Sequence, residues 1–351
     1  MDISHSEIRA GYQLIRYALN ESLGITIAFD PAYTPLPANG GLRFSHYESH
    51  AAQDEEALIL AQQMTKKHRL YNTGFAGVKL VANGANTPDN KIKILNAVAD
   101  ILNRFQGKIY TGCDININNQ DMTYLTTLTP YVLSGLESQI DTSYATAYGV
   151  YASVKAMMQH YPTRQNNTLM VHGIGKLGRV LVTQLIKDGH TVYSYDINSD
   201  AAEINCAINM SAQDNWFETK CDYLLLCSHS GVITEEIAHN LNCTYLISGA
   251  NAPFASEHVV TILKEKNIIW LPDVISNSGA VICDVLEYTQ KEKYRSIDPQ
   301  NAYTFIYNAI FDKASKILSL TKKYPLRPDQ ILDIFFTTEQ HEPILNADFM
   351  N

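Results

Sequence analysis

The segment at residues 168–198 constrains the fold of this 351-residue chain more than any other. A short apolar run at 169–171 enters a glycine turn, and leucines and valines then recur at helical intervals. A second β-rich run at 192–195 ends on an acid, Asp196. The glycines follow the spacing G-x-G-x-x-G: Gly173, Gly175 and Gly178. This order of strand, turn, helix, strand and acid is typical of a dinucleotide-binding βαβ unit, whereas a merely structural turn needs no acid.

Each part of this unit has a physical task in binding a dinucleotide. The three glycines permit a tight turn, close approach of a pyrophosphate, and close packing of helix on strand. The pyrophosphate would lie on the unpaired N–H groups of the helix N-terminus. Asp196 can accept hydrogen bonds from a ribose diol and would repel a 2′-phosphate, so we expect NAD rather than NADP. The residues expected to contact the cofactor here are Gly173, Ile174, Gly175, Lys176, Leu177, Gly178 and Asp196.

The spacing of the other apolar runs predicts an α/β protein with two domains. Short strands are expected at 169–172, 192–195, 223–227, 245–248 and 268–271, mostly with helices between them. That rhythm is typical of a doubly wound parallel sheet of the Rossmann type. The first half also alternates strands and helices but has no glycine fingerprint. There we expect an amphipathic helix at 7–23 and a proline-rich loop from Pro31 to Pro37 that runs into Gly40 and Gly41.

Composition and local signals exclude several functions. The net charge of −9 argues against a nucleic-acid partner, because phosphate binding needs clustered basic residues. The N-terminus lacks the features of a signal peptide, and no apolar run reaches the ~18–20 residues of a membrane span. The six cysteines are scattered, which suits a reducing cytoplasm. His46 and His50 lack the glutamate of H-E-x-x-H, so no metal site is expected.

Seven ordered segments resemble one family, the glutamate/leucine/phenylalanine/valine dehydrogenases. They are Asn-Gly-Gly-Leu-Arg-Phe at 39–44, Gln-Met-Thr-Lys-Lys at 63–67, Gly-Phe-Ala-Gly-Val-Lys at 74–79, Tyr-Thr-Gly-Cys-Asp at 110–114, Thr-Ala-Tyr-Gly-Val-Tyr at 146–151, Ser-Gly-Ala-Asn-Ala-Pro at 248–253, and Pro-Asp-Val-Ile-Ser-Asn-Ser-Gly-Ala at 272–280. The length is nearer the leucine branch, and the 248–253 segment is more like the glutamate branch.

The resemblance implies reversible, NAD-dependent oxidative deamination of an L-amino acid to its 2-oxo acid and ammonia. It also implies a homo-oligomer, dimer or higher, with the reaction in a cleft between two domains. The substrate and oligomerisation domain would comprise 1–133 plus 323–351. The NAD-binding Rossmann domain would comprise 134–322, starting near Pro130 and Gly135, which interrupt the pattern.

The resemblance also assigns roles to individual residues. Lys67 would hold the substrate carboxylate, Lys79 would be the base that activates water, and Asp114 would exchange protons with the amino group. Gly40 and Gly41 would line the substrate pocket. The remaining cofactor contacts would be Thr146, Cys227, Ser228, Asn251 and Asn277. Without the resemblance, Lys67 and Lys79 would be read as ordinary exposed lysines.

Several positions depart from the family pattern. Ala76 and Val78 replace glycines before the expected catalytic lysine, and we expect this bulk to reshape the pocket. Asn39 stands where glutamate enzymes carry a lysine and leucine enzymes an apolar residue. Asp284 stands where relatives carry a serine or a small apolar residue, and a buried aspartate would repel a glutamate side chain. We therefore expect a substrate other than glutamate, with a polar, cationic or N–H-bearing side chain, unless Asp284 points away from the pocket.

Two other functions stay open at this point. One is a nucleotide-binding or regulatory protein whose altered lysine segment has lost turnover. The other is an oxidoreductase of the same plan that acts on a related 2-oxo or 2-hydroxy acid. The sequence does not give the substrate, the subunit count or the physiological direction.

Overall fold

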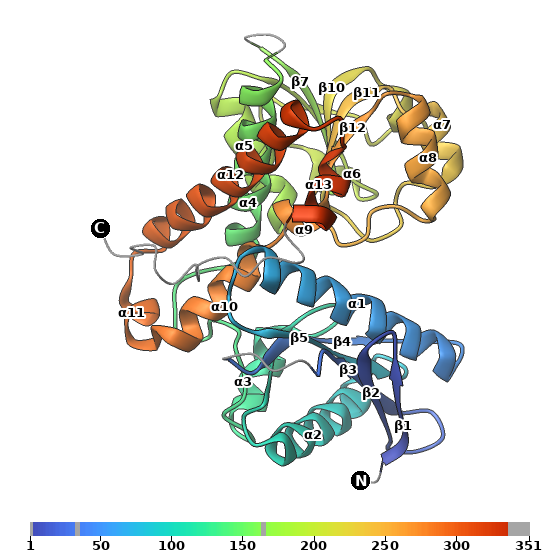
Figure 1. Cartoon of the computed structure of the whole chain (residues 1–351), viewed down its shortest axis with the longest axis vertical. Helices are drawn as coiled ribbons and strands as arrows, with labels where there is room; N and C mark the ends of the chain where they lie inside the picture. Colours follow the sequence, from blue (N-terminus) through green and yellow to red (C-terminus); the bar gives the residue numbers. More distant parts are fainter. Residues whose placement is uncertain (1–2, 32–35, 163–165, 336–351) are drawn as a thin grey trace. The chain divides into compact units, whose positions relative to one another are not determined.

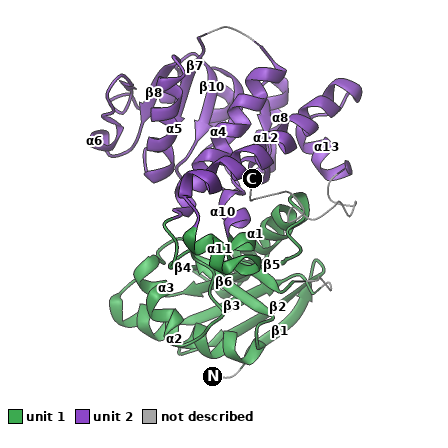
Figure 2. Cartoon of the chain, turned by 90° about the vertical axis from the view of Figure 1, so that its left-hand side faces the viewer, with its two compact units in different colours: residues 1–139, 284–296, 340–351 green, residues 140–283, 297–339 purple. Residues whose placement is uncertain are grey.

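The structure, a computed structural model, describes residues 3–31, 36–162 and 166–335 (Figure 1). Two compact units make up the chain (Figure 2). Within the described ranges, unit 1 draws on Met1–Gln139 and Asp284–Ser296, and unit 2 draws on Ile140–Cys283 and Ile297–Glu339. The expected α/β class and the Rossmann-type second half are confirmed.

Unit 1 is built on a mixed sheet whose strand order is β1-β2-β3-β5-β4-β6. Neighbours from β1 to β5 are antiparallel, whereas β4 runs parallel to both β5 and β6. The strands are β1 (Ile3–Arg9), β2 (Tyr12–Ala18), β3 (Gly24–Phe29), β4 (Ala38–Ser45), β5 (Ala76–Asn83) and β6 (Ile109–Cys113). The helices are α1 (His50–Leu70), α2 (Pro88–Phe105) and α3 (Asn119–Thr126).

The two faces of this sheet differ in chemistry. Helices α1 and α2 lie on opposite faces (Figure 1). Toward α2 the sheet is apolar, with Leu42, Val78 and Leu80 fully buried in the main core. Toward α1 a smaller apolar cluster gives way to buried charged side chains such as Lys79. We call this second surface the α1 face. Because side chains alternate along a strand, the same strands build the core and the polar surface.

The helix expected at 7–23 is wrong, because β1 and β2 form a hairpin there. Ala10 and Gly11 turn the chain with φ values of 49° and 82°. Leu14 packs in the cluster under α1, and Tyr17 packs in the core under α2. Both faces of the strand are covered, so its apolar residues do not alternate strictly, and their spacing imitates a helix.

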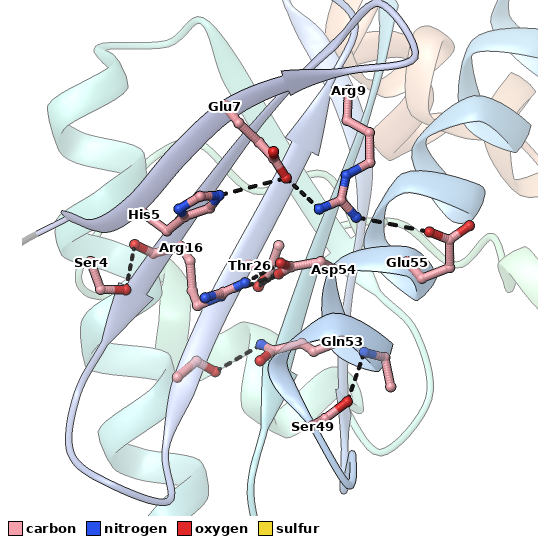
Figure 3. Close-up of polar contacts among 12 residues, drawn as sticks. Ser4, His5, Glu7, Arg9, Arg16, Thr26, Ser49, Gln53, Asp54 and Glu55 are labelled. Carbon is pink, nitrogen blue, oxygen red and sulfur yellow. Dashed lines mark hydrogen bonds and ion pairs between the residues drawn. The ribbon is translucent and has the colours of Figure 1, made fainter.

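Polar contacts attach this hairpin to the start of α1 (Figure 3). The Arg16 guanidinium pairs with the buried carboxylate of Asp54. The Thr26 hydroxyl donates to the same carboxylate at 2.9 Å. Gln53 Nε2 donates to the Val81 carbonyl at 2.9 Å. Three strands are thereby attached to the first turn of one helix.

The expected loop at 31–37 ends where strand β4 begins, and Gly40 and Gly41 lie inside that strand. Glycine is disfavoured in strands, so the sequence did not predict β4. Here the packing requires one, because a methyl group added at Gly40 would lie 1.7 Å from the Val78 carbonyl oxygen. Such a glycine marks a close approach of two backbones.

Unit 2 is a parallel sheet with the strand order β12-β11-β10-β7-β8-β9. Counted from β7, this is the order 3-2-1-4-5-6 of dinucleotide-binding folds. The strands are β7 (Thr168–His172), β8 (Thr191–Tyr195), β9 (Ile208–Asn209), β10 (Cys221–Leu226), β11 (Cys243–Ser248) and β12 (Ile269–Leu271). Helices cover both faces, with α4 and α5 on one and α7 and α8 on the other (Figure 1).

The helical elements that begin in unit 2 are α4 (Thr142–His160), α5 (Lys176–Lys187), α6 (Ser199–Ala202), η1 (Trp216–Glu218), α7 (Glu235–Asn240), α8 (Glu257–Glu265), α9 (Asp273–Ser276), α10 (Gly279–Thr289), α12 (Pro299–Lys323) and α13 (Pro328–Phe335). Helix α11 (Lys291–Ser296) belongs to unit 1. None of the helices in the described ranges is both long enough and apolar enough to cross a membrane.

The units differ from the expected domains in two segments. Residues 284–296 belong to unit 1, where Val285 packs on Phe75 and Leu133. Residues 323–335 belong to unit 2, where the Arg327 guanidinium lies 5.5 Å from the Trp270 ring centroid. The rest of the expected C-terminal segment, 336–351, lies outside the described residues. The chain passes from unit 1 to unit 2 at Gln139 and Ile140, close to the expected boundary.

Candidate active site

A buried lysine and a largely buried carboxylate meet on the α1 face of unit 1. Lys79 projects from the middle of β5 and is 5% exposed, and Asp114 directly follows β6. The Lys79 Nζ atom lies 2.5 Å from Oδ2 of Asp114. Arg43 on β4 donates from Nε to the same oxygen at 3.0 Å and also pairs with Glu56 of α1. Three neighbouring strands therefore deliver one connected ionic cluster.

The cluster shifts the proton affinities of its members. Burial lowers the pKa of Lys79, since a charged amine is costly away from water, and the Arg43 charge lowers it further, while Asp114 opposes both. Burial alone would raise the pKa of Asp114, but the positive charges of Lys79 and Arg43 hold it well below its usual range. The site thus combines an ionised carboxylate with an amine that gives up its proton more readily than a free lysine.

Gly41 leaves space beside this pair. A methyl group built on it would lie 3.3 Å from Lys79 Nζ and 3.1 Å from the Asp114 Cβ. Any side chain at this position would therefore occupy the volume next to the amine. Gly41 thus keeps room at the reactive group, whereas Gly40 serves the approach of β4 to β5.

The substitutions at Ala76 and Val78 leave the α1 face unchanged. Both side chains are buried in the apolar core beneath α2, on the opposite side of β5 from Lys79. The residue on the same side as Lys79 is Gly77, where an added methyl would lie 2.3 Å from the Thr65 backbone nitrogen. The expectation that Ala76 and Val78 reshape the pocket is therefore wrong in its geometry.

The last turn of α1 places Lys67 on unit 1 as a buried side chain, 5% exposed. Its neighbour His68 ties this turn to the sheet, with Nε2 at 3.0 Å from the Asn39 carbonyl and Nδ1 at 2.8 Å from the Thr73 hydroxyl. Burial lowers the pKa of His68 to about 4, so the ring is neutral at physiological pH.

Sequence reasoning missed Arg43 and His68 as members of the site. The sequence could have placed Arg43 in the site, because it follows Gly41 by two positions and side chains that alternate along a strand put both residues on one face. The adjacent glycines at 40 and 41, which are weak strand formers, hid that alternation. His68 had no local signal, since its partners come from other segments.

The structure brings Asn39 and Asp284 together. Asn39 on β4 is fully buried and donates from Nδ2 to Oδ2 of Asp284, on α10, at 2.7 Å. The two residues are 245 positions apart in the chain. Asp284 therefore faces Asn39 and does not point away from it.

The glycine turn of unit 2 has the geometry of a dinucleotide loop. Gly173 adopts a φ of +94°, and a methyl group at Gly178 would lie 1.9 Å from the Gly173 carbonyl oxygen. A methyl group at Gly175 would meet nothing within 4 Å, so the space above the start of α5 is open. No side chain caps this helix, which leaves its first N–H groups available to a ligand.

Asp196 holds the same loop from the end of β8. One carboxylate oxygen accepts from the Ile174 backbone N–H at 2.6 Å, and the other accepts from the Asn198 N–H at 2.9 Å. Lys176 and Leu177 begin α5, and the Lys176 amine lies 3.5 Å from an Asp141 carboxylate oxygen. Asp196 is thereby positioned beside the glycine turn, as a ribose-binding acid must be.

The other expected cofactor residues follow the carboxyl ends of neighbouring strands. Cys227 and Ser228 follow β10, and Ser228 Oγ lies 2.9 Å from Nδ1 of His172. Asn251 follows β11, and its Oδ1 accepts from Asn277 Nδ2 at 3.0 Å. Ligands of parallel α/β sheets bind at this edge.

One further observation fits a polar ligand at this edge. The buried oxygen of Asn277, Oδ1, has no hydrogen-bond partner in the described part of the chain. Thr146 lies on α4, where its hydroxyl donates to the Thr142 carbonyl at 2.9 Å. The backbone nitrogen of Thr146 would lie only 2.6 Å from a methyl group added at Gly279.

Within the described ranges, no three His, Cys, Asp or Glu side chains are arranged to hold a metal ion.

Comparisons with known proteins find chains similar to this one. A family model described as Glutamate/Leucine/Phenylalanine/Valine dehydrogenase matches residues 195–328. A leucine dehydrogenase of Thermoactinomyces intermedius is 26% identical over 299 residues, which cover 82% of this chain and 79% of that protein. A phenylalanine dehydrogenase of Lysinibacillus sphaericus is 26% identical over 274 residues, which cover 73% of this chain and 72% of that protein.

A solved structure shares the fold. The L-tryptophan dehydrogenase from Nostoc punctiforme superposes with a TM-score of 0.72 at 20% sequence identity. The superposition covers 94% of this chain and 93% of that one. Both units of the chain therefore have counterparts in that protein.

Proposed function

Because the chain belongs to the glutamate/leucine/phenylalanine/valine dehydrogenase family, we propose that it oxidises an L-amino acid with NAD⁺. The reaction converts the amino acid and water to the 2-oxo acid and ammonia, and it is reversible. The observation that carries this proposal is the buried contact of Lys79 Nζ with Asp114, 2.5 Å apart beside the space that Gly41 leaves open.

Lys79 acts as the general base in this proposal. Its amine must be neutral to accept a proton from the water that attacks the imino carbon, and burial favours that neutral form. Asp114 exchanges a proton with the substrate nitrogen. Arg43 positions Asp114 through its hydrogen bond from Nε and keeps the carboxylate ionised between proton transfers.

Lys67 binds the substrate α-carboxylate, as a buried positive charge at the end of α1. The backbone at Gly40 and Gly41 forms the wall of the same pocket. Both proposals rest on the placement of these residues in unit 1, on strand β4 and on the helix that covers it.

Unit 2 would hold the dinucleotide. The backbone from Gly173 to Gly178 would bind the pyrophosphate, and Asp196 would bind the adenosine ribose and disfavour a 2′-phosphate. The nicotinamide half would be held by Cys227, Ser228 and Asn251, which follow strands β10 and β11, together with Thr146 on α4 and Asn277 after α9. When bound, the cofactor supplies the hydride acceptor.

Glutamate is not the substrate in this proposal. Asp284 would bring a carboxyl group to the side-chain end of the pocket, and no basic residue in the described part of the chain forms an ion pair with it. The side-chain carboxylate of glutamate would be buried there without a counterion, which is costly. The homo-oligomeric state and the cytoplasmic location expected from the sequence also stay predictions, and light scattering on the purified chain tests the first.

A spectrophotometric screen tests the function. The full chain is incubated with NAD⁺ and each of the common L-amino acids, and NADH is followed by absorbance. We expect at least one amino acid to be oxidised, and Lys79→Ala to lower that rate by at least ~100-fold. NAD binding without any turnover would favour a regulatory protein. Reduction of a 2-oxo acid by NADH without ammonium would indicate a hydroxy-acid enzyme.

A further inference from the structure

The Asn39–Asp284 pair is a second polar cluster of unit 1, distinct from the Lys79–Asp114 pair. Asn39 is fully buried, and the NH₂ end of its amide is used by the hydrogen bond to Asp284. The other end, Oδ1, is buried and has no hydrogen-bond partner in the described part of the chain. Buried amide oxygens are nearly always paired, so this unpaired oxygen points to a donor supplied by a ligand.

Asp284 is equally short of donors. The Asn39 amide is its one side-chain hydrogen-bond partner in the described ranges. Burial raises the pKa of Asp284 to about 8, with a contribution from the nearby Glu287 that the Asn39 hydrogen bond offsets only in part. Together the two residues present acceptor oxygens, and no basic side chain in the described ranges forms an ion pair with Asp284.

The pair lies at a defined distance from the reactive amine. Asn39 and Gly41 are two positions apart on β4, which corresponds to about 6.7 Å along a strand. Gly41 is the residue whose added methyl would lie 3.3 Å from Lys79 Nζ. A substrate with its α-carbon beside Lys79 therefore needs a side chain of roughly four bonds or more to reach Asn39.

Aromatic rings border this path. Tyr110 pairs in register with Asn39 on the neighbouring strand β6. Tyr288 follows Asp284 by one helical turn, and its ring centroid lies 5.2 Å from that of Tyr110 and 5.2 Å from that of Phe75. Such rings suit the apolar stem of a long side chain and can also face a cation.

We propose that Asn39 and Asp284 bind the far end of the substrate side chain, and that this end carries N–H donors. The proposal rests on the amino-acid dehydrogenase function above. An ammonium, guanidinium, amide or ring N–H group would supply donors to Asn39 Oδ1 and to the Asp284 carboxyl. An aliphatic side chain would leave Asn39 Oδ1 buried and unpaired and would add no donor to the Asp284 carboxyl.

Substrate preference of the full chain tests this inference. The rates with NAD⁺ are compared for L-lysine, L-ornithine and L-arginine, for L-glutamine and L-tryptophan, and for L-leucine and L-methionine. We expect the best N–H-bearing amino acid to exceed leucine and methionine by at least ~10-fold in kcat/KM. A lead for the first three would identify Asp284 as a counterion, and a lead for the neutral pair would identify hydrogen bonding alone.

Two variants and one matched control make the test specific. Asp284→Asn and the double change Asn39→Leu with Asp284→Leu should lower the preference for N–H-bearing over aliphatic substrates by roughly 10- to 100-fold. Glu292→Gln removes an exposed carboxylate of α11, the next helix along the chain, and should leave the preference unchanged.

The inference and the function fail in different ways. If leucine or methionine equals the N–H-bearing amino acids, or if the variants keep the original preference, the inference is overturned while the enzyme function stands. If no amino acid is oxidised, the function is overturned. Thermal stabilisation of the full chain by the same amino acids then tests the inference, because stabilisation by a bound ligand needs no turnover. Greater stabilisation by leucine than by any N–H-bearing amino acid would overturn it.

Discussion

At the scale of single residues, the site joins groups whose partners come from distant parts of the chain. Lys79, Asp114 and Asn39 could be selected from the sequence because they lie in motifs that resemble a family. The role of Arg43 could not be predicted from the sequence, because nothing in the local sequence indicates that its guanidinium reaches Asp114. The contact of Asn39 with Asp284 could not be predicted either, because the position of Asp284 along its helix does not reveal which strand it will face.

The first prediction concerns the pH dependence of catalysis. Burial lowers the pKa of Lys79, so kcat/KM should rise with pH through a value below the ~10.4 of a free lysine. Lys79→Arg, which stays protonated, should lower kcat by at least ~100-fold at every pH. The measurement is a pH–rate profile for both proteins.

Lys66 offers the matched control, because it is an exposed lysine one position from Lys67 on α1. Lys66→Arg should keep the wild-type profile. A profile of Lys79→Arg that follows the wild type would exclude Lys79 as the base.

The second prediction concerns stability. A carboxyl whose folded pKa is raised to about 8, from about 3.9 when unfolded, contributes stability that is complete below pH ~4 and is lost as the pH rises through 8. Asp284→Asn has no carboxyl to titrate at this position, so it removes this loss of stability with rising pH. The variant should therefore gain in free energy of unfolding, relative to the wild type, between pH 5 and pH 9.

Chemical denaturation of both proteins at several pH values measures this difference. Glu292→Gln is the comparison, because that carboxylate is 87% exposed and should leave the pH dependence unchanged. An identical pH dependence for Asp284→Asn and the wild type would contradict the prediction.

At the scale of elements, what could be predicted depends on how many faces of an element are covered. The strands of unit 2 stood out as short apolar runs because helices bury both faces of a parallel sheet. Strand β2 is also covered on both faces, but Arg16 interrupts its apolar residues. The resulting pattern of apolar and polar residues predicted a helix. Strand β4 was missed because Gly40 and Gly41, which its packing and site require, are weak strand formers.

The third prediction compares two glycines of different elements. Gly77→Ala places a methyl 2.3 Å from the Thr65 nitrogen, so α1 must move from the sheet, and unfolding free energy should fall by roughly 1–3 kcal/mol. Gly175→Ala meets no atom within 4 Å and should fold normally, yet its methyl stands in the space assigned to the pyrophosphate. It should weaken NAD binding, measured by calorimetric titration, by at least ~10-fold. Equal stability of Gly77→Ala and the wild type, or unchanged NAD affinity of Gly175→Ala, would count against these assignments.

At the scale of the whole molecule, both tryptophans of the chain, Trp216 and Trp270, lie in unit 2. They are buried in the core of that unit, at 5% exposure each. Tryptophan fluorescence during heating therefore reports the unfolding of unit 2, while circular dichroism reports the entire chain.

This distribution permits a fourth prediction. NAD at 100 times its dissociation constant should stabilise the folded chain by about 2.7 kcal/mol and raise the fluorescence-detected midpoint. NADP at the same concentration should raise it less, because Asp196 disfavours a 2′-phosphate. Asp196→Asn should reduce the difference between the midpoints measured with NAD and with NADP. Equal stabilisation of the wild type by NADP would contradict the assignment of Asp196.

Helix α10 has a consequence for protein engineering. It begins at Gly279 in unit 2 and crosses into unit 1 at Asp284. The residue proposed to select the substrate is therefore encoded downstream of the nucleotide-binding strands. A chimera that replaces everything after residue 139 with a relative's sequence would import that relative's side chain at position 284 as well. Recombination intended to exchange cofactor preference would then alter substrate preference, unless the crossover returned to this chain before Asp284.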